Sequence, residues 1–321
     1  MTRREFLRFA ATLLPALPRP ALAQSYPSRP VRIVVGFTAG GSTDLGARLI
    51  GQWLQDRLGQ PFVVENRPGA ATNIATESVV RAPPDGYTLL MVGPSSAVNA
   101  TLYDKLGFVF LRDIVPVAGV SRQPQVLLVN PSVPATTVPE LVAYARANPG
   151  RITMASAGVG SMGHLVGEFF KMTAGVDFVH VPYRGAGPAL TDLIGGQVLT
   201  SFAGIAGAIA HVRSGRLRAL AVTTSARAEA LPEVPAVGEF LDGFEAADWL
   251  GVGAPRGTPA EVVEVLNRNI TAGIADARIR ARFADLGGTP LALTPAEFGG
   301  LLAAETEKWG KVVRAANIRT E

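Results

Sequence analysis

Strand-like runs alternate with helix-like segments along most of the chain, and this alternation limits the possible folds more than any other feature. The β-branched run Val31–Val35 ends at Gly36, and residues 42–58 then carry apolar side chains at helical spacing. Further strand-like runs lie at 62–64, 87–92, 126–129, 151–154, 177–181 and 217–222, and helical segments at 139–147, 161–172 and across most of 259–315. The pattern predicts an α/β protein with mostly parallel sheets.

The length of 321 residues exceeds the comfortable size of one hydrophobic core, so two lobes are expected. No low-complexity linker separates them, which suggests that the chain passes between the lobes more than once, along strands. Two such crossovers would form a hinge, and ligands favour the cleft between hinged lobes.

Residues 1–23 have the layout of a secretory signal peptide. A charged start with Arg3 and Arg4 precedes a short apolar stretch and the small-residue motif Ala21-Leu22-Ala23. The arginine pair resembles a twin-arginine export signal, and the alternative is a short amphipathic helix. We expect cleavage near Ala23 and a mature chain outside the cytoplasm.

Charge and cysteine content exclude several classes of function. Four of the 30 Lys and Arg residues and one of the 26 acidic residues lie within 1–23, so the remainder has a net charge of only +1. No patch of Lys and Arg interleaved with aromatic residues occurs, so nucleic-acid binding is unsupported. The three histidines stand far apart without an acidic ligand cluster, which disfavours a catalytic metal. The absence of Cys removes disulfides, thiolate metal sites and Cys nucleophiles. No metal or other cofactor is expected.

Three segments share the order strand, small-residue turn and helix start, which suits the binding of an anion by free backbone N–H groups. They are residues 36–44, 155–164 and 181–188, referred to below as the first, second and third loops. Arg184 in the third loop can pair with a carboxylate, or it is a surface arginine. His164 in the second loop is more often a hydrogen-bonded structural residue than a base. A weaker segment of this kind contains Ser95.

An ordered set of short motifs resembles one family, the substrate-binding proteins of tripartite tricarboxylate transporters, often called the Bug family. Order and spacing match over essentially the whole mature chain, and the matching stretches are 26–35, 40–44, 64–69, 84–90, 130–134, 180–185, 217–223 and 309–313. The resemblance implies a two-lobed periplasmic binding protein of the type II, Venus-flytrap kind, with two crossovers. The lobes would comprise 24–125 with 247–321, and 126–246.

The resemblance also implies a small carboxylate ligand, held in the cleft by backbone amides, hydroxyls and water and delivered to membrane transporter subunits. Together with the local patterns it gives the expected ligand-binding residues: Phe37, Thr38, Ala39, Gly40, Gly41, Ser42, Asp44, Ser95, Ser156, Ala157, Gly158, Ser161, His164, Tyr183, Arg184, Phe202 and Ala203. Ala203 stands where the family often has Asp. We therefore expect a pocket without an acidic contact for an amino group, suited to a more apolar or bulkier carboxylate.

Two other functions remain open at this point. A closed, ligand-bound form could act on a signalling receptor as a sensor. An exported hydrolase using Ser95 or Ser156 is the competing enzyme class, although Ser161 and Ser95 both fail the strict nucleophile-elbow pattern. We expect a monomer without enzymatic activity.

Overall fold

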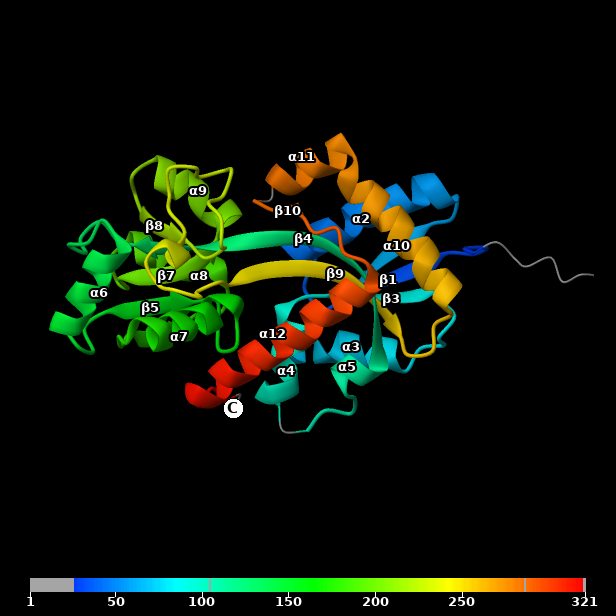
Figure 1. Cartoon of the computed structure of the whole chain (residues 1–321), viewed down its shortest axis with the longest axis horizontal. Helices are drawn as coiled ribbons and strands as arrows, with labels where there is room; N and C mark the ends of the chain where they lie inside the picture. The colour runs from blue at the N-terminus through cyan, green and yellow to red at the C-terminus, as the bar shows by residue number, and fades with distance from the viewer. Residues whose placement is uncertain (1–25, 104, 286, 320–321) are drawn as a thin grey trace, which may run out of the picture.

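The computed structural model describes residues 26–103, 105–285 and 287–319 and has two lobes joined by two long strands (Figure 1). The expected signal peptide, residues 1–23, lies outside the described residues. The first lobe is built from β1 (Val31–Val35), α2 (Ser42–Leu58), β2 (Phe62–Asn66), η1 (Ala70–Thr72), α3 (Asn73–Val80), β3 (Thr88–Val92), α4 (Pro94–Leu102), α5 (Phe110–Asp113), α10 (Ala260–Ala275), α11 (Ala277–Asp285) and β10 (Thr289–Pro290).

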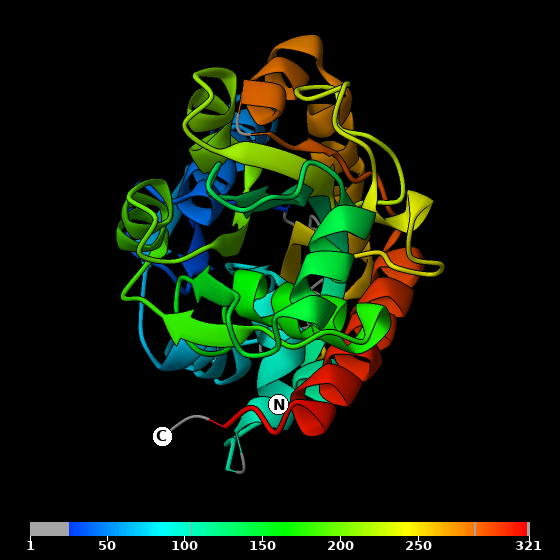
Figure 2. The ribbon, with the colours of Figure 1, turned by 90° about the vertical axis from the view of Figure 1, so that its left-hand side faces the viewer.

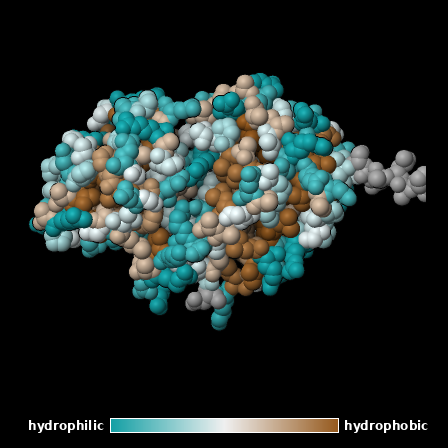
Figure 3. Space-filling model, viewed as in Figure 1, coloured by the Kyte–Doolittle hydropathy of each residue, from teal (hydrophilic) through white to brown (hydrophobic). Residues whose placement is uncertain are grey.

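The second lobe repeats the alternation of strand and helix. It contains α6 (Val138–Ala147), β5 (Thr153–Ser156), α7 (Met162–Ala174), β6 (Val179–Pro182), α8 (Ala186–Ile194), β7 (Thr200–Gly204), α9 (Ile205–Arg213), β8 (Arg218–Val222) and η2 (Val237–Glu239). Figure 2 views the molecule from the end of this lobe, and Figure 3 shows that the surface narrows between the two lobes.

The lobes are connected by β4 (Ile114–Val129) and β9 (Ala247–Pro255), which lie side by side in Figure 1. From Ile114 to Pro124, β4 pairs with β9, and from Gln125 to Val129 it pairs with β7 instead. The pairing of β4 with β9 contains two register shifts, the irregularity at which strands bend. We therefore retain, as a proposal, the division into 24–125 with 247–321 and 126–246.

The expectation of mostly parallel sheets is only partly correct. The strand pairs β1–β2, β1–β3, β5–β6 and β5–β7 are parallel, but every pair that involves β4 or β9 is antiparallel. The parallel pairs come from strand–helix–strand units within each lobe. The crossover strands enter from the opposite lobe, so they run against their neighbours and make the joined sheet mixed.

The final helix, α12 (Pro295–Ala315), contacts both lobes. Its first half places Phe298 and Leu302 in a core of the first lobe, together with Trp249. Its second half places Trp309 in a core that includes Phe170 and other residues of the second lobe. The helix therefore adds a third connection across the hinge. Within the described residues, no helix combines the length and apolar character needed to cross a membrane.

Candidate functional site

A small cavity of about 60 Å³ lies between the lobes, against the crossover strand β9. Its lining comes from the first lobe (Phe37, Thr43, Gly93, Pro94, Ser95), the second lobe (Gly160, Met162, Leu165) and β9 (Asp248, Leu250). The strands β1, β3 and β5 end near this cavity. Binding sites in open α/β sheets lie at the carboxyl ends of the strands. The position agrees with a ligand site in the cleft.

The first loop is held in place by a buried carboxylate. Asp44 is 1% exposed, and its Oδ2 accepts hydrogen bonds from the Gly40 backbone at 2.9 Å and from Arg48 Nε at 3.0 Å. Its Oδ1 accepts from Asn66 Nδ2 at 2.9 Å. Burial raises the pKa of Asp44, but these hydrogen bonds outweigh it and hold the pKa at about 2. Asp44 thus fixes the first loop from its buried side, while residues 37–42 are exposed.

The second loop is held by Ser156 and His180. The Ser156 hydroxyl lies 2.7 Å from His180 Nε2, accepts from the Gly158 backbone N–H and donates to the Gly158 carbonyl, both at 3.1 Å. With the hydroxyl hydrogen directed to that carbonyl, His180 Nε2–H is the donor to Oγ. Gly158 has φ +133°, which other residues rarely adopt, so the tight turn around Ser156 depends on glycine.

A second histidine braces the other end of the same loop. His164 Nδ1 accepts from the Gly160 backbone at 3.1 Å, and its ring stacks on that of His180 with centroids 3.7 Å apart. Burial, with smaller contributions from His180 and Lys171, lowers the pKa of His164 to about 3. Burial and Lys171 likewise lower the pKa of His180 to about 4. Both rings are therefore neutral in the folded protein near pH 7. His164 is a hydrogen-bonded structural residue, as expected from the sequence.

The third loop presents an arginine. Tyr183 is fixed by a hydrogen bond from its hydroxyl to Asp192 Oδ2 at 2.7 Å. Arg184 is exposed and makes no hydrogen bond or ion pair with the part of the chain that the structure describes. Its neighbour Tyr183 approaches the second loop, since its carbonyl would lie 3.3 Å from a Cβ added at Gly158. An unpaired guanidinium beside the second loop suits an anionic ligand.

The helices that begin at these loops leave their first N–H groups without side-chain caps. The N-cap residues are Gly41 for α2, Gly93 for α4, Ser161 for α7 and Gly185 for α8, and none makes a side-chain cap hydrogen bond. Helices α3, α5 and α10 also lack such a cap, whereas α6 and α12 are capped by Thr137 and Thr294. The Ser161 hydroxyl is buried without a partner in the described structure. Free donors at helix starts attract anions.

The structure brings some of the expected residues together and separates others. Phe37 and Ser95 line the cavity, and the backbone of the second loop reaches it at Gly160. Phe202, expected to contact ligand, is 2% exposed and packs on Phe170 in the core of the second lobe, with ring centroids 5.5 Å apart. Ala203 is partly buried and packs against another apolar cluster of that lobe.

Three lining residues lie outside the loops considered in the sequence: Leu165, Asp248 and Leu250. Met162 belongs to the second loop but not to the expected ligand-binding residues, and Leu165 follows that loop by one residue in the first turn of α7, so a slightly longer motif would have included it. Asp248 stands alone in front of a buried strand segment, and no local pattern distinguishes it from an ordinary surface residue.

The contact between Ser156 and His180 is also the geometry of a nucleophile and its base, which bears on the hydrolase alternative. Ser156 is only 1% exposed, and its hydroxyl already makes two hydrogen bonds within the loop. No carboxylate contacts His180 in the described residues. This arrangement braces the loop and does not present Oγ to a substrate. Likewise, the residues described contain no group of three or more His, Asp or Glu placed to hold a metal.

Comparison with known proteins identifies the family. The model of the tripartite tricarboxylate transporter family receptor matches residues 47–318. Protein BugT of Bordetella pertussis is 39% identical over 303 residues, covering 94% of this chain and 93% of BugT. The structure of R. palustris Rpa4515 with adipate is 37% identical, with a TM-score of 0.81 over 92% of this chain and 99% of that one. MatC (Rpa3494) from Rhodopseudomonas palustris with bound malate is 33% identical, with a TM-score of 0.76 over 90% and 100% of the two chains. The chain therefore belongs to the tripartite tricarboxylate transporter receptor family, whose members are two-lobed periplasmic solute-binding proteins.

Proposed function

We propose that this protein captures a small carboxylate between its lobes and delivers it to the membrane subunits of a tripartite tricarboxylate-type transporter. The observation that carries the proposal is that α2, α4 and α7 begin at one interlobe cavity without side-chain caps, with the unpaired Arg184 beside the second loop. These groups offer hydrogen-bond donors and positive potential without a competing internal anion. The adipate and malate in the related structures support the ligand class.

Binding requires movement about the hinge. The cavity of about 60 Å³ is far below the roughly 300–1,000 Å³ that is typical of small-molecule pockets. Met162 and Leu165 from one lobe and Phe37 from the other line this small cavity. We propose that the lobes separate by bending at the irregular pairing of β4 and β9, and that they close again on the ligand to form the surface recognised by the membrane partner.

The proposed role includes export and a monomeric state. The signal-peptide pattern in residues 1–23 and the membership of a periplasmic receptor family support a mature protein that starts near Gln24 in the periplasm. The proposed monomer leaves both lobes free to move about the hinge.

Gly41→Glu is expected to abolish most ligand-induced stabilisation. Gly41 has ordinary backbone angles, and the nearest atom to an added Cβ is 3.8 Å away, so the fold accommodates the side chain. The new carboxylate repels a carboxylate ligand at the start of α2. The ligand is first identified by a thermal-shift screen of mono-, di- and tricarboxylates. At 100 times Kd a ligand stabilises by about 2.7 kcal/mol, which raises Tm by several degrees.

The matched control is Gly300→Glu, on the exposed side of α12, where an added Cβ also meets open space. It should keep the full ligand-induced shift. If Gly41→Glu retained the shift as well, the first loop would not belong to the site. If no carboxylate in the screen stabilised the natural protein, the proposed function would be wrong.

Arg184→Ala should weaken carboxylate binding by about 1.5–3 kcal/mol, or roughly 10- to 100-fold in Kd, because a charge-assisted hydrogen bond is lost. Isothermal titration calorimetry measures the change. Arg213→Ala removes another exposed arginine, on α9, and serves as the control. Equal Kd values for the two variants would place Arg184 on the surface and outside the site.

A further inference from the structure

Asp248 is the only charged residue among those that line the interlobe cavity in the described structure. It lies at the start of β9, where side chains alternate between the two faces of the strand. Leu250 lines the same cavity, whereas Trp249 between them packs against Phe298 of α12. Asp248 and Leu250 therefore face the cavity together, and the carboxylate of Asp248 belongs to its wall.

The hydrogen bonding of this carboxylate is incomplete. Oδ1 accepts from the backbone N–H of Trp249 at 3.0 Å, and Oδ2 has no donor among the described residues. No cation in the described part of the chain pairs with it: Arg122 on β4 pairs with Glu245, and Lys308 on α12 pairs with Glu305. Asp248 is partly buried, and a carboxylate withdrawn in part from water with one backbone donor gains from a further donor or a cation.

We propose that Asp248 binds an ammonium group of the ligand, so that this protein prefers amino-substituted carboxylates over the unsubstituted acids. The inference rests on the proposed function, since the carboxylate end of the ligand is assigned to the helix starts and Arg184. The ammonium group supplies the donor and the positive charge that Asp248 lacks inside the protein. This replaces the expectation, drawn from Ala203, that the pocket has no acidic contact, because an acidic side chain reaches the cavity from a different strand.

The environment of Asp248 also predicts how this preference depends on pH. Burial, opposed by the hydrogen bond from the Trp249 N–H and assisted by the nearby charge of Glu305, raises the pKa of Asp248 to about 6. The other charged groups around it are Lys308, Glu245 and Arg122, which are engaged with one another and with Glu305. An ammonium ligand needs the ionised carboxylate, so its binding should weaken as the pH falls through about 6.

The test compares three pairs of acids that share a carbon skeleton: succinate with aspartate, glutarate with glutamate, and adipate with 2-aminoadipate. Isothermal titration calorimetry at pH 7.5 should show at least tenfold tighter binding of the amino acid within the pair that fits. Asp248→Asn, which keeps an acceptor for the Trp249 N–H, should lower affinity for that amino acid 10- to 100-fold and leave the unsubstituted acid within about threefold. Asp242→Asn, in an exposed loop of the second lobe, is the control.

The outcomes separate this inference from the proposed function. Tighter binding of the unsubstituted acid at pH 7.5, growing as the pH falls toward 5, would overturn the role of Asp248, because it shows a protonated Asp248 donating to a second ligand carboxylate. That role would be overturned equally if Asp248→Asn left the preference for the amino acid unchanged. If neither acid of any pair bound, both the inference and the choice of small carboxylates would fall.

Discussion

Glu305→Ala should lower the free energy of unfolding by about 3–5 kcal/mol. Glu305 is 8% exposed, and its Oε2 accepts from the indole N–H of Trp309 at 2.8 Å and of Trp249 at 3.1 Å. Its Oε1 accepts from Lys308. Alanine leaves two buried indole donors and a partly buried ammonium without their acceptor. Each unsatisfied buried donor costs about 1–3 kcal/mol, and removing one partner of a buried ion pair costs about 3–5 kcal/mol.

Urea denaturation at pH 7 measures this loss. Glu305→Gln should fall between the natural protein and alanine, since one amide oxygen still accepts from an indole. Glu307→Ala removes the next glutamate of α12, which forms an exposed pair with Lys311, and should change stability little. A loss for Glu305→Ala no greater than that for Glu307→Ala would contradict the energetic role assigned to the buried hydrogen bonds.

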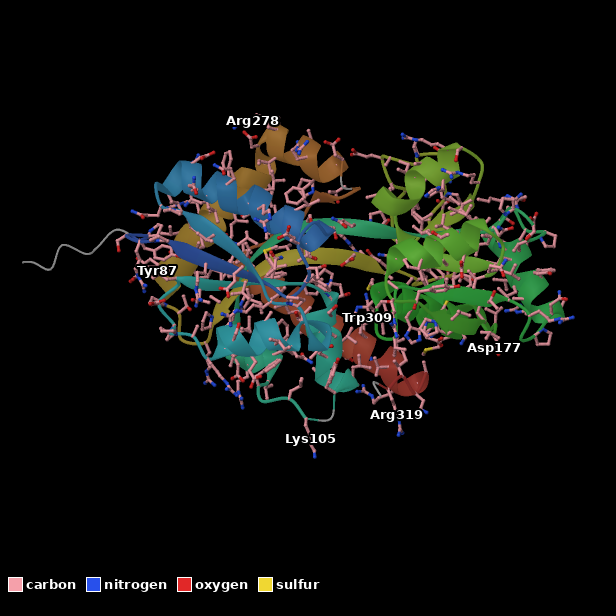
Figure 4. The ribbon with its side chains drawn as sticks, turned by 180° about the vertical axis from the view of Figure 1, so that it is seen from behind. Tyr87, Lys105, Asp177, Arg278, Trp309 and Arg319 are labelled. Atoms are coloured by element: carbon pink, nitrogen blue, oxygen red, sulfur yellow. The ribbon has the colours of Figure 1, made fainter. Side chains whose placement is uncertain are left out.

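Glu305 also connects the last helix to the cleft. Trp309 lies on α12 between the two lobes (Figure 4), and Trp249 lies on the crossover strand β9, so one carboxylate ties both elements together. The adjacent Asp248 faces the cavity, and its pKa is raised in part by the charge of Glu305. Removing that charge lowers the pKa of Asp248. In Glu305→Gln, the pH at which an ammonium ligand loses affinity should therefore move downward.

Local sequence signals predicted most of the elements, because each has a local physical cause. Gly59 ends α2 in a left-handed conformation (φ +73°) and returns its N–H to the Gln55 carbonyl. Pro259 and Pro295 mark the starts of α10 and α12. The strand β9 was not predicted, because its sequence ADWLGVGAP has neither a β-branched run nor polar alternation. Its burial on both faces comes from the crossover, which is a property of the whole fold.

The candidate site was predictable to the level of its loops and no further. Glycine turns followed by helix starts identified the first and second loops, and these reach the cavity at Phe37 and Gly160. Which face of a strand a side chain occupies depends on tertiary packing, so Phe202 was assigned to the ligand but lies in the core. For the same reason, no local sequence signal marks Asp248 as a residue of the cavity. Its significance comes from Ser95, Met162 and other residues far away in the chain that enclose it.

Acidification from pH 7 to pH 4.5 should remove roughly 3–5 kcal/mol of stability through His164 and His180. Both pKa values are lowered in the folded protein, to about 3 and about 4, while histidine in an unfolded chain titrates near 6.5. Below pH 6.5 the unfolded chain therefore binds protons that the folded chain does not. The free energy of unfolding falls as the pH falls, by about 1.4 kcal/mol per pH unit for each histidine, until the folded-state pKa values are reached.

A double variant with His164→Asn and His180→Gln isolates this contribution of the two histidines to acid sensitivity. Asn can accept from the Gly160 N–H as Nδ1 does, and Gln can reach Ser156 Oγ as Nε2 does, so the second loop keeps its hydrogen bonds without a titrating group. Urea denaturation at pH 7 and 4.5 should show a much smaller loss in the double variant. The control, His211→Gln on α9, should keep the loss of the natural protein. An equal loss in the double variant would assign the acid sensitivity to carboxylates instead. Because the two rings hold both ends of the second loop, their protonation should also lower ligand affinity, which makes acid unfolding and ligand release two consequences of one buried pair.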